Sequence, residues 1–355
     1  MQLHNFIPFP IFCFENRDPD GNKRGVFLVR GTFRLPDRDS GAPILPVPEQ
    51  PKIEFRDVFR GDSATTSLLT ETDLAPFKPG ADIYFNATAY APEGLPAPEW
   101  DVAATLGTAT KRLRVTGPRH WRRRRWGGWK LDDPEPVDRV PLTYEQSFGG
   151  SYTGGDEEQV TYMANPVGKG YFDPKAAPRD QPVAAPQVMD PEAPVHEPGE
   201  PMRPESLAPV ARHWQPRLAR AGTMDQAWVD HRAPKLPADY CEGFNNCAHE
   251  DLIYEGYPEG DEDVVLEGLC PGGGRLHFAL PRYRVGLLMR FCSGRLHIVP
   301  LVLDTIYFDL RAESLSDFRV HLTWRANYPL DEPIRVLESR LVHPGQTWME
   351  RVTWQ

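Results

Sequence analysis

Short apolar runs separated by turn residues dominate the hydrophobic pattern of the chain. In the first third, residues 25–35, 82–90 and 101–115 are rich in β-branched and aromatic side chains, which favour strands. Turn formers at residues 18–22 precede the first run and predict a hairpin leading into it. Gly107 interrupts the third run, as a bulge or a turn between two strands would.

The last third of the chain returns to this pattern. Gly, Pro and Asp separate many of its apolar runs at spacings of roughly ten residues, which is typical of a β-sandwich or an open barrel. Residues 214–230 have the composition of a short helix or of an ordered loop, and the pattern does not choose between them. The predicted strands of this part are 264–266, 276–280, 285–291, 296–303, 306–310, 318–324 and 334–342.

The proline content narrows the fold class. The chain has 38 prolines in 355 residues, about twice the average share. Proline disfavours the interiors of helices and of central strands. We therefore expect a mainly β protein with sandwich- or barrel-like antiparallel sheets, few short helices and long Pro-rich loops.

The densest proline stretch bears on the domain organisation. Residues 174–209 contain ten prolines and few large apolar side chains, so we expect a loop or linker that buries little surface. The favoured interpretation is one compact unit over residues 1–355 that carries this loop. The alternative is two β subdomains, at residues 1–173 and 210–355.

Charge and composition exclude several classes of protein. The net charge is -10, the wrong sign for a protein whose main partner is nucleic acid. No stretch approaches eighteen apolar residues, and the first residues lack a basic region and a cleavage site, so we expect a cytoplasmic protein with no membrane insertion. The 5 cysteines are an odd number, which fits reduced thiols better than disulfides.

Two segments carry opposite charge. Residues 111–130 hold nine basic side chains and no acidic one, and the three residues in this segment most suited to contact a partner protein are Arg123, Trp126 and Trp129. A solvated loop is the alternative for this segment. Residues 249–263 hold seven acidic side chains and no Lys or Arg. They form either a solvated edge or a face that meets the basic segment within the fold.

No motif for a metal or a cofactor is complete. Cys241, Cys247 and His249 have residue types that suit zinc, but their spacing is atypical, and buried cysteines usually act as small apolar groups. The turn at residues 18–22 begins like a calcium loop and lacks the closing carboxylate. We therefore predict neither a metal nor a cofactor.

Catalytic signals are equally weak. No nucleotide-binding loop and no Gly-x-Ser-x-Gly motif occurs. Glu145 and Asp225 could serve a hydrolase, but nothing in the sequence places them together. Structural ion pairs with Arg217 or Arg119 are the other interpretation of these carboxylates, and we predict no catalytic residue.

Several phrases along the chain nevertheless resemble one bacterial family, domain of unknown function 2169. The phrases include Lys78-Pro-Gly-Ala-Asp82, Pro141-Leu-Thr-Tyr-Glu-Gln-Ser-Phe-Gly-Gly150 and Asn165-Pro-Val-Gly-Lys-Gly-Tyr171. They occur in the order of the family, from about Asn5 to Val342. The matching residues, which we expect to be mainly structural, are Tyr144, Glu145, Phe148, Gly149, Gly150, Asn165, Pro166, Gly168, Trp214, Arg217, Gly222, Thr223, Asp225, Asp304, Thr305, Trp324 and Arg325.

The resemblance implies a function that the residues alone do not. Genes of this family tend to lie beside those of type VI secretion spikes and effectors. A family member is therefore expected to be a cytoplasmic adaptor or chaperone that binds an effector and helps to load it onto the spike complex. Two alternatives stay open: a hydrolase-type enzyme with unplaced carboxylates or histidines, and a structural component of the secretion apparatus.

Overall fold

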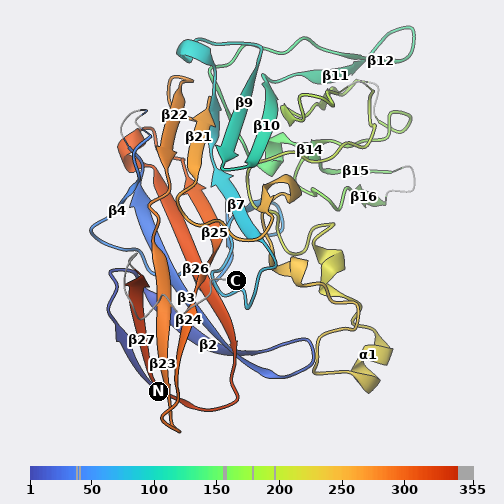
Figure 1. The fold of residues 1–355 in the computed structure, drawn as a ribbon. Coiled ribbons are helices and arrows are strands. Elements are labelled where there is room, and N and C mark those ends of the chain that lie inside the picture. The colour runs from blue at the N-terminus through green and yellow to red at the C-terminus, as the bar shows by residue number, and fades with distance from the viewer. Residues whose placement is uncertain (37–38, 40, 155–157, 178–179, 196, 343–355) are drawn as a thin grey trace.

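The computed structural model describes residues 1–36, 39, 41–154, 158–177, 180–195 and 197–342. Three larger β-sheets form the body of the protein (Figure 1). The seven-stranded sheet contains β2 (Ile11–Arg17), β3 (Lys23–Arg34), β26 (Arg319–Pro329), β25 (Val302–Asp309), β7 (Ala81–Asn86) and β20 (Ile253–Tyr254) in that order, with β4 (Leu45–Pro46) paired to β3.

The other two larger sheets pack against the same core. The five-stranded sheet has the order β19 (Val188–Met189), β10 (Ala109–Thr116), β9 (Glu99–Leu106), β21 (Asp263–Glu267) and β22 (Arg275–Ala279). The four-stranded sheet has the order β1 (Gln2–Asn5), β27 (Ile334–Val342), β23 (Arg284–Phe291) and β24 (Leu296–Pro300). One hydrophobic core contains side chains from all three sheets, among them Phe27, Val102 and Leu287.

Short strand pairs and single-turn helices complete the fold. The small sheet β12 (Trp129–Leu131), β11 (His120–Arg123) and β18 (Val183–Ala184) projects at one end. The strand pairs are β13 (Arg139–Pro141) with β8 (Thr88–Tyr90), β14 (Phe148–Gly149) with β17 (Lys169–Gly170), β15 (Ser151–Thr153) with β16 (Gln159–Thr161), and β5 (Val58–Phe59) with β6 (Leu68–Thr70). The helices of the described residues are α1 (Gln226–His231) and the 3-10 turns η1 (Pro92–Gly94), η2 (Tyr144–Gln146), η3 (Leu218–Ala221), η4 (Glu242–Asn245), η5 (Glu250–Leu252) and η6 (Leu315–Asp317).

The expected fold class is confirmed. The protein is mainly β, most strand pairs are antiparallel, and α1 is the single α-helix in the described ranges. Across the residues that the structure describes, the sheets do not close into a barrel. Parallel pairing joins β25 to β7, β1 to β27 and β14 to β17. No helix within the described residues has the length and apolar character needed to span a membrane.

Most predicted strands lie where the apolar pattern put them. Gly107 forms the turn between β9 and β10, with a φ of 54° that favours glycine. The run predicted as one strand at 296–303 is instead two, because the chain leaves β24 at Leu301 and enters β25 in the other sheet. Residues 214–230 contain both the 3-10 turn η3 and the short helix α1.

The interpretation of residues 174–209 as a stretch that buries little surface is wrong for much of the described part. Val188 and Met189 form strand β19, pair with β10 and are buried. Leu207 lies in the main core and is fully buried. Small and medium apolar side chains are buried here because the segment pairs with β10 and packs against side chains from other strands. In the seven-stranded and five-stranded sheets, strands that precede this segment pair with strands that follow it. Examples are β3 with β26 and β9 with β21.

The two faces of the seven-stranded sheet differ in chemistry. Strand alternation sends Phe85 and Phe308 into the core, where their rings stack 4.4 Å apart. The opposite face carries Tyr84 and Tyr307, stacked at 4.7 Å, together with buried polar side chains. Loops cover this second face, so its polar groups are paired inside the protein rather than hydrated.

Candidate functional site

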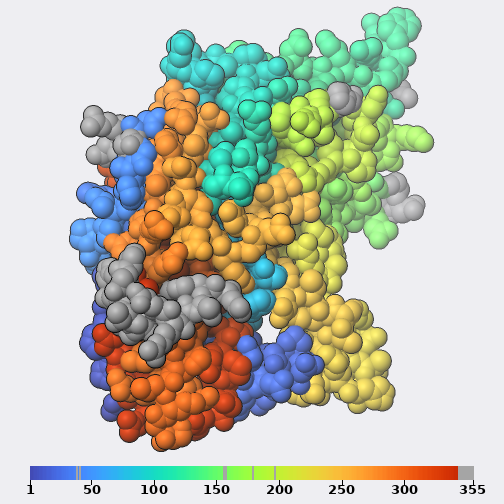
Figure 2. Space-filling model, viewed as in Figure 1, coloured from blue at the N-terminus to red at the C-terminus, as the bar shows by residue number. Residues whose placement is uncertain are grey.

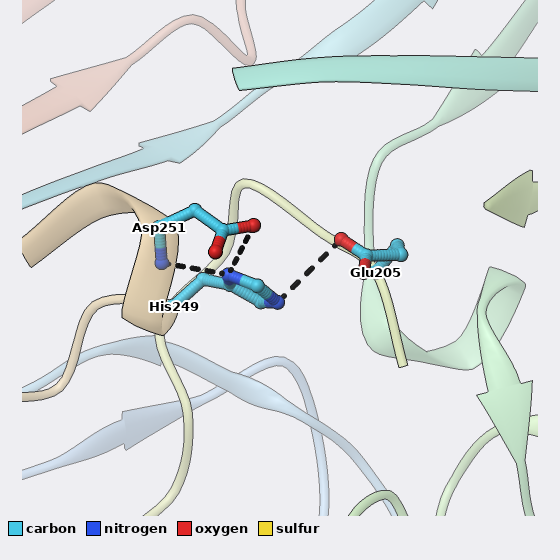
Figure 3. A group of neighbouring side chains, drawn as sticks. All are labelled: Glu205, His249 and Asp251. Carbon is cyan, nitrogen blue, oxygen red and sulfur yellow. Dashed lines mark hydrogen bonds and ion pairs between the residues drawn. The ribbon is translucent and has the colours of Figure 1, made fainter. Parts of the chain in front are cut away.

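A compact group of charged side chains lies between strand β10 and the turn η5. Lys111 comes from β10, Glu205 from the irregular chain after residue 200, and His249 and Asp251 from the start of η5. Glu205, His249 and Asp251 are drawn in Figure 3, where their polar atoms point toward one another. We call Lys111, Glu205, His249 and Asp251 the charged cluster.

The Lys111 ammonium occupies the centre of the charged cluster. Its Nζ lies 2.5 Å from Oε2 of Glu205, 2.9 Å from Oδ2 of Asp251 and 3.3 Å from Nδ1 of His249. The side chains of Lys111 and Glu205 are only 3% and 2% exposed. The acceptors of the cluster therefore face the same cation, and Glu205 and His249 do so in a region with little water, whereas Asp251 is partly exposed.

The titration behaviour follows from this arrangement. Burial first, and then the charge of Lys111, lower the pKa of His249 from 6.5 to about 3. The ring is therefore neutral at neutral pH, and its Nδ1 also accepts a hydrogen bond from the Asp251 amide at 3.3 Å. Burial acts to raise the pKa of Asp251, but hydrogen bonds and charge from Lys111 and Arg203 outweigh it and lower the pKa to about 2.

Arg203 closes the charged cluster on its solvent side. Its guanidinium donates to Oε1 of Glu205 at 2.5 Å, to Oδ2 of Asp251 at 2.7 Å and to Glu250 at 2.9 Å. Two hollows flank the group: one of about 90 Å³ lined by His249 and Tyr144, and one of about 240 Å³ lined by Lys111 and Glu205. Arg203 contributes to both linings.

Glu205, His249 and Asp251 have ligand types that can hold zinc, and their ligand atoms lie within 4.8 Å of one another. The ammonium of Lys111, however, already stands among the three of them. A cation bound there would lie next to that positive charge. The geometry therefore suits an internal ion pair better than a metal centre.

The zinc candidates considered from sequence are not the residues that come together. Cys247 lies in a small buried group with Tyr84 and Tyr307, and burial raises the pKa of its thiol well above the usual value. Cys241 is exposed. His249 instead lies in the charged cluster, where two of its neighbours, Lys111 and Glu205, are far away in sequence. This is why local spacing missed Lys111 and Glu205.

One sequence signal did point toward the charged cluster. The basic segment 111–130 and the acidic segment 249–263 were expected either to meet or to stay solvated. The two segments meet where Lys111, at the start of the basic segment, forms an ion pair with Asp251 of the acidic segment. Complementary charge was thus informative where motif spacing was not.

The two candidate catalytic carboxylates hold separate elements in place. Glu145 accepts hydrogen bonds from the amide and hydroxyl of Ser67, at 2.7 and 2.8 Å. Asp225 caps helix α1 by accepting from the amide of Trp228 at 2.9 Å. No contact among the described residues joins the two. Their expected arginine partners are also wrong, since Arg217 pairs with Glu71 and Arg119 contacts Met189.

The glycines and Asn165 of the family phrases build one tight turn. Asn165 donates from Nδ2 to the carbonyls of Tyr144 and Phe148, at 2.8 and 2.9 Å. Gly149 and Gly150 have φ of 147° and 97°. A Cβ on Gly149 would lie 2.1 Å from the Asn165 carbonyl oxygen. Pro166 and Gly168 belong to the loop that Asn165 begins.

Most of the other family residues form buried ion pairs or packing contacts, whereas Thr223 forms an exposed hydrogen bond. Arg325 donates to Asp304 at 2.5 Å, and Lys78 bridges Asp82 at 2.7 Å and Thr305 at 2.8 Å. The remaining contacts are Trp214 against Tyr144, Trp324 against Phe9, Arg217 to Glu71, and Thr223 to Asp239, with Gly222 at a φ of 79°.

The β11–β12 hairpin, residues 120–131, projects away from the body (Figure 1) and stands out at the upper right of the surface in Figure 2. Trp126 at its tip is 95% exposed. Arg123 and Trp129, which the sequence grouped with Trp126, form the last strand pair before the turn and are half-buried. Trp129 donates from Nε1 to the Pro174 carbonyl at 3.2 Å and packs edge-on against Phe172.

Comparison with known proteins gives a family. Residues 20–325 match the family described as an uncharacterized protein conserved in bacteria, DUF2169. The match covers most of the chain, so the chain belongs to this family. No curated protein and no solved structure matches it.

Proposed function

We propose that the chain is a cytoplasmic adaptor or chaperone that binds a type VI secretion effector and helps to load it onto the spike complex. The observation that carries a binding role is Trp126, a large aromatic side chain held in water at the tip of a braced, basic hairpin. Exposed aromatic and arginine side chains are the usual anchors of protein interfaces. The identification of the partners as an effector and the spike is inferred from the family resemblance.

A hydrolase is the second candidate, because carboxylates and a histidine converge beside two hollows. Efficient proton transfer needs a group whose pKa lies near the working pH. The pKa values of His249 and Asp251 instead lie near 3 and 2, so their protonation states are constant around neutral pH. Lys111 and Arg203 also occupy the carboxylate oxygens that a substrate would need.

Stoichiometry separates these candidates. The tagged chain is purified from its native host, and copurifying proteins are identified by mass spectrometry. For an adaptor, the melting temperature of the captured effector rises with the concentration of the chain, and the mass of the effector does not change. An altered effector mass after incubation with catalytic amounts of the chain would establish the enzyme instead. A stable complex with spike proteins alone would indicate a structural component.

A further inference from the structure

We propose that the β11–β12 hairpin binds an acidic surface of a partner protein, with Trp126 as its apolar anchor. The inference rests on the proposed adaptor function and deepens it, because it specifies the chemistry of one partner's contact face. Three features of the hairpin support it: like charges paired across the strands, an open tip, and a strand pair below the tip that is fixed to the body of the protein.

The outer face of the hairpin places like charges side by side. Arg122 on β11 is directly opposite Lys130 on β12. Like charges at such positions destabilise a strand pair, and Asp132 at 2.6 Å from Arg122 neutralises only one of them. Carboxylates of a negatively charged partner would attract both cations and offset their mutual repulsion.

The tip adds charge and an apolar group. Arg124 and Arg125 are exposed, and no partner within the described residues binds their guanidinium groups. Trp126 follows them directly, and its exposed fraction of 95% leaves almost the whole indole available for contact. The matching surface therefore has carboxylates around a small apolar recess.

The hairpin is held in one shape before it binds. At the tip, the Arg124 amide donates to Gly128 at 3.0 Å, and the Gly127 amide donates to Arg124 at 3.2 Å. Just below the turn, Trp129 donates a hydrogen bond to the Pro174 carbonyl, and the Arg123 guanidinium lies over the Trp129 ring at 5.7 Å. A preorganised anchor loses less conformational entropy on association, which favours specific protein binding.

An acidic protein fits better than nucleic acid. The whole chain carries a net charge of -10 and repels a long polyanion at a distance. Single-stranded nucleic acid is usually held by several aromatic side chains that stack successive bases. The hairpin tip offers one, Trp126, because Trp129 is already packed against Phe172.

The charge requirement is tested with a fluorescently labelled all-glutamate peptide and two variants of the full chain. The hairpin variant carries Arg124→Glu, Arg125→Glu and Lys130→Glu. The matched control carries Arg34→Glu, Arg56→Glu and Arg335→Glu, three exposed positions with the same total change of charge. We expect the hairpin variant to weaken peptide binding by at least about tenfold and the control to weaken it less than about threefold. Equal losses in both variants would overturn the proposal.

The third variant, Lys130→Glu alone, tests the repulsion between strands. It places a carboxylate opposite Arg122, so the melting temperature of the chain is expected to rise slightly. A lower melting temperature would contradict the argument from like charges. The same measurement shows whether each variant is folded.

The anchor is tested with a second peptide that has leucines at the centre of the glutamates. Trp126→Phe is expected to retain binding of this peptide, and Trp126→Ala to lose at least about fivefold. The loss should be smaller with the all-glutamate peptide. Equal losses for both peptides would refute an apolar anchor.

Oligothymidylate and phosphatidylserine vesicles serve as competing probes. Tighter binding of either probe than of the peptides, abolished in the hairpin variant, would overturn the assignment to a protein partner. The adaptor function fails separately: it fails if the chain binds the acidic peptides through the hairpin but raises no effector's melting temperature. Effector stabilisation that survives the hairpin variant would refute the inference and leave the adaptor in place.

Discussion

The Lys111 ammonium lies 2.5 Å from Oε2 of Glu205, and both side chains are almost completely buried. The two residues are 94 positions apart, so this pair joins strand β10 to the irregular segment after residue 200. A buried charge without its partner is costly, because the dehydrated ion is left uncompensated. The pair therefore makes the packing of this segment depend on strand β10.

Lys111→Met is expected to lower the free energy of unfolding by about 3 kcal/mol, since the buried Oε2 of Glu205 would lose its cation and Arg203 would remain paired only with Oε1. Urea denaturation measures the loss. Arg112→Met is the matched control, because Arg112 is the next residue of the same strand and is exposed. It should cost less than about 0.5 kcal/mol. Similar losses for both variants would mean that the ion pair contributes little beyond its packing.

The Lys111 ammonium is also expected to prevent metal binding at the charged cluster. We expect wild-type protein dialysed against a mild chelator to hold no stoichiometric zinc or calcium, because the ammonium stands among the donors of the charged cluster. In Lys111→Met, the three donors Glu205, His249 and Asp251 are free of that ammonium, so added zinc should raise the melting temperature of the variant. Elemental analysis and thermal melts check both parts. Zinc retained by the wild type would contradict this prediction.

Stability should fall as the pH falls below neutrality. The pKa of His249 is lowered from 6.5 to about 3 in the folded protein, so below pH 6.5 the unfolded chain binds a proton that the folded chain does not. The contribution of His249 to the free energy of unfolding is complete above pH 6.5 and is lost progressively as the pH falls toward 3. Asp251 adds a loss in the same direction as the pH falls from 3.8 toward 2.

His249→Gln tests this assignment. The variant should show a shallower dependence of unfolding free energy on pH between 6.5 and 5, measured by denaturant titration at several pH values. The pKa values of His321 and His213 are also lowered by burial, so part of the slope should remain. An unchanged slope would show that His249 does not titrate as the structure indicates.

The two hairpin tryptophans should behave differently when truncated. Trp126→Ala is expected to leave the melting temperature unchanged, since its side chain is 95% exposed. Trp129→Ala should cost about 2 kcal/mol, because it removes the contact with Phe172 and the hydrogen bond to Pro174. Differential scanning calorimetry compares them. Equal melting temperatures would show that Trp129 is not packed against Phe172.

The sequence by itself determined the fold class and most strands. Alternation of apolar and polar side chains and a high share of β-branched residues favour a strand through local interactions. Runs such as 285–291 could therefore be assigned as strands without knowing which strands lie beside them. Gly107 as a turn follows from the same local chemistry. The phrases shared with the family also depend only on residue order, and they identified the family correctly.

Only the tertiary structure decided which distant residues meet. Glu205 belongs to the stretch predicted as a Pro-rich loop or linker, but packing against strands formed elsewhere buries it beside Lys111. His249 shares no contact with Cys241 or Cys247 among the described residues, because its neighbours are set by the approach of η5 to β10. Likewise, the sequence grouped Trp126 with Trp129, and only the hairpin register separates them, since one lies at the turn and the other faces Phe172. Burial depends on contacts across the whole chain, and a local pattern cannot encode them.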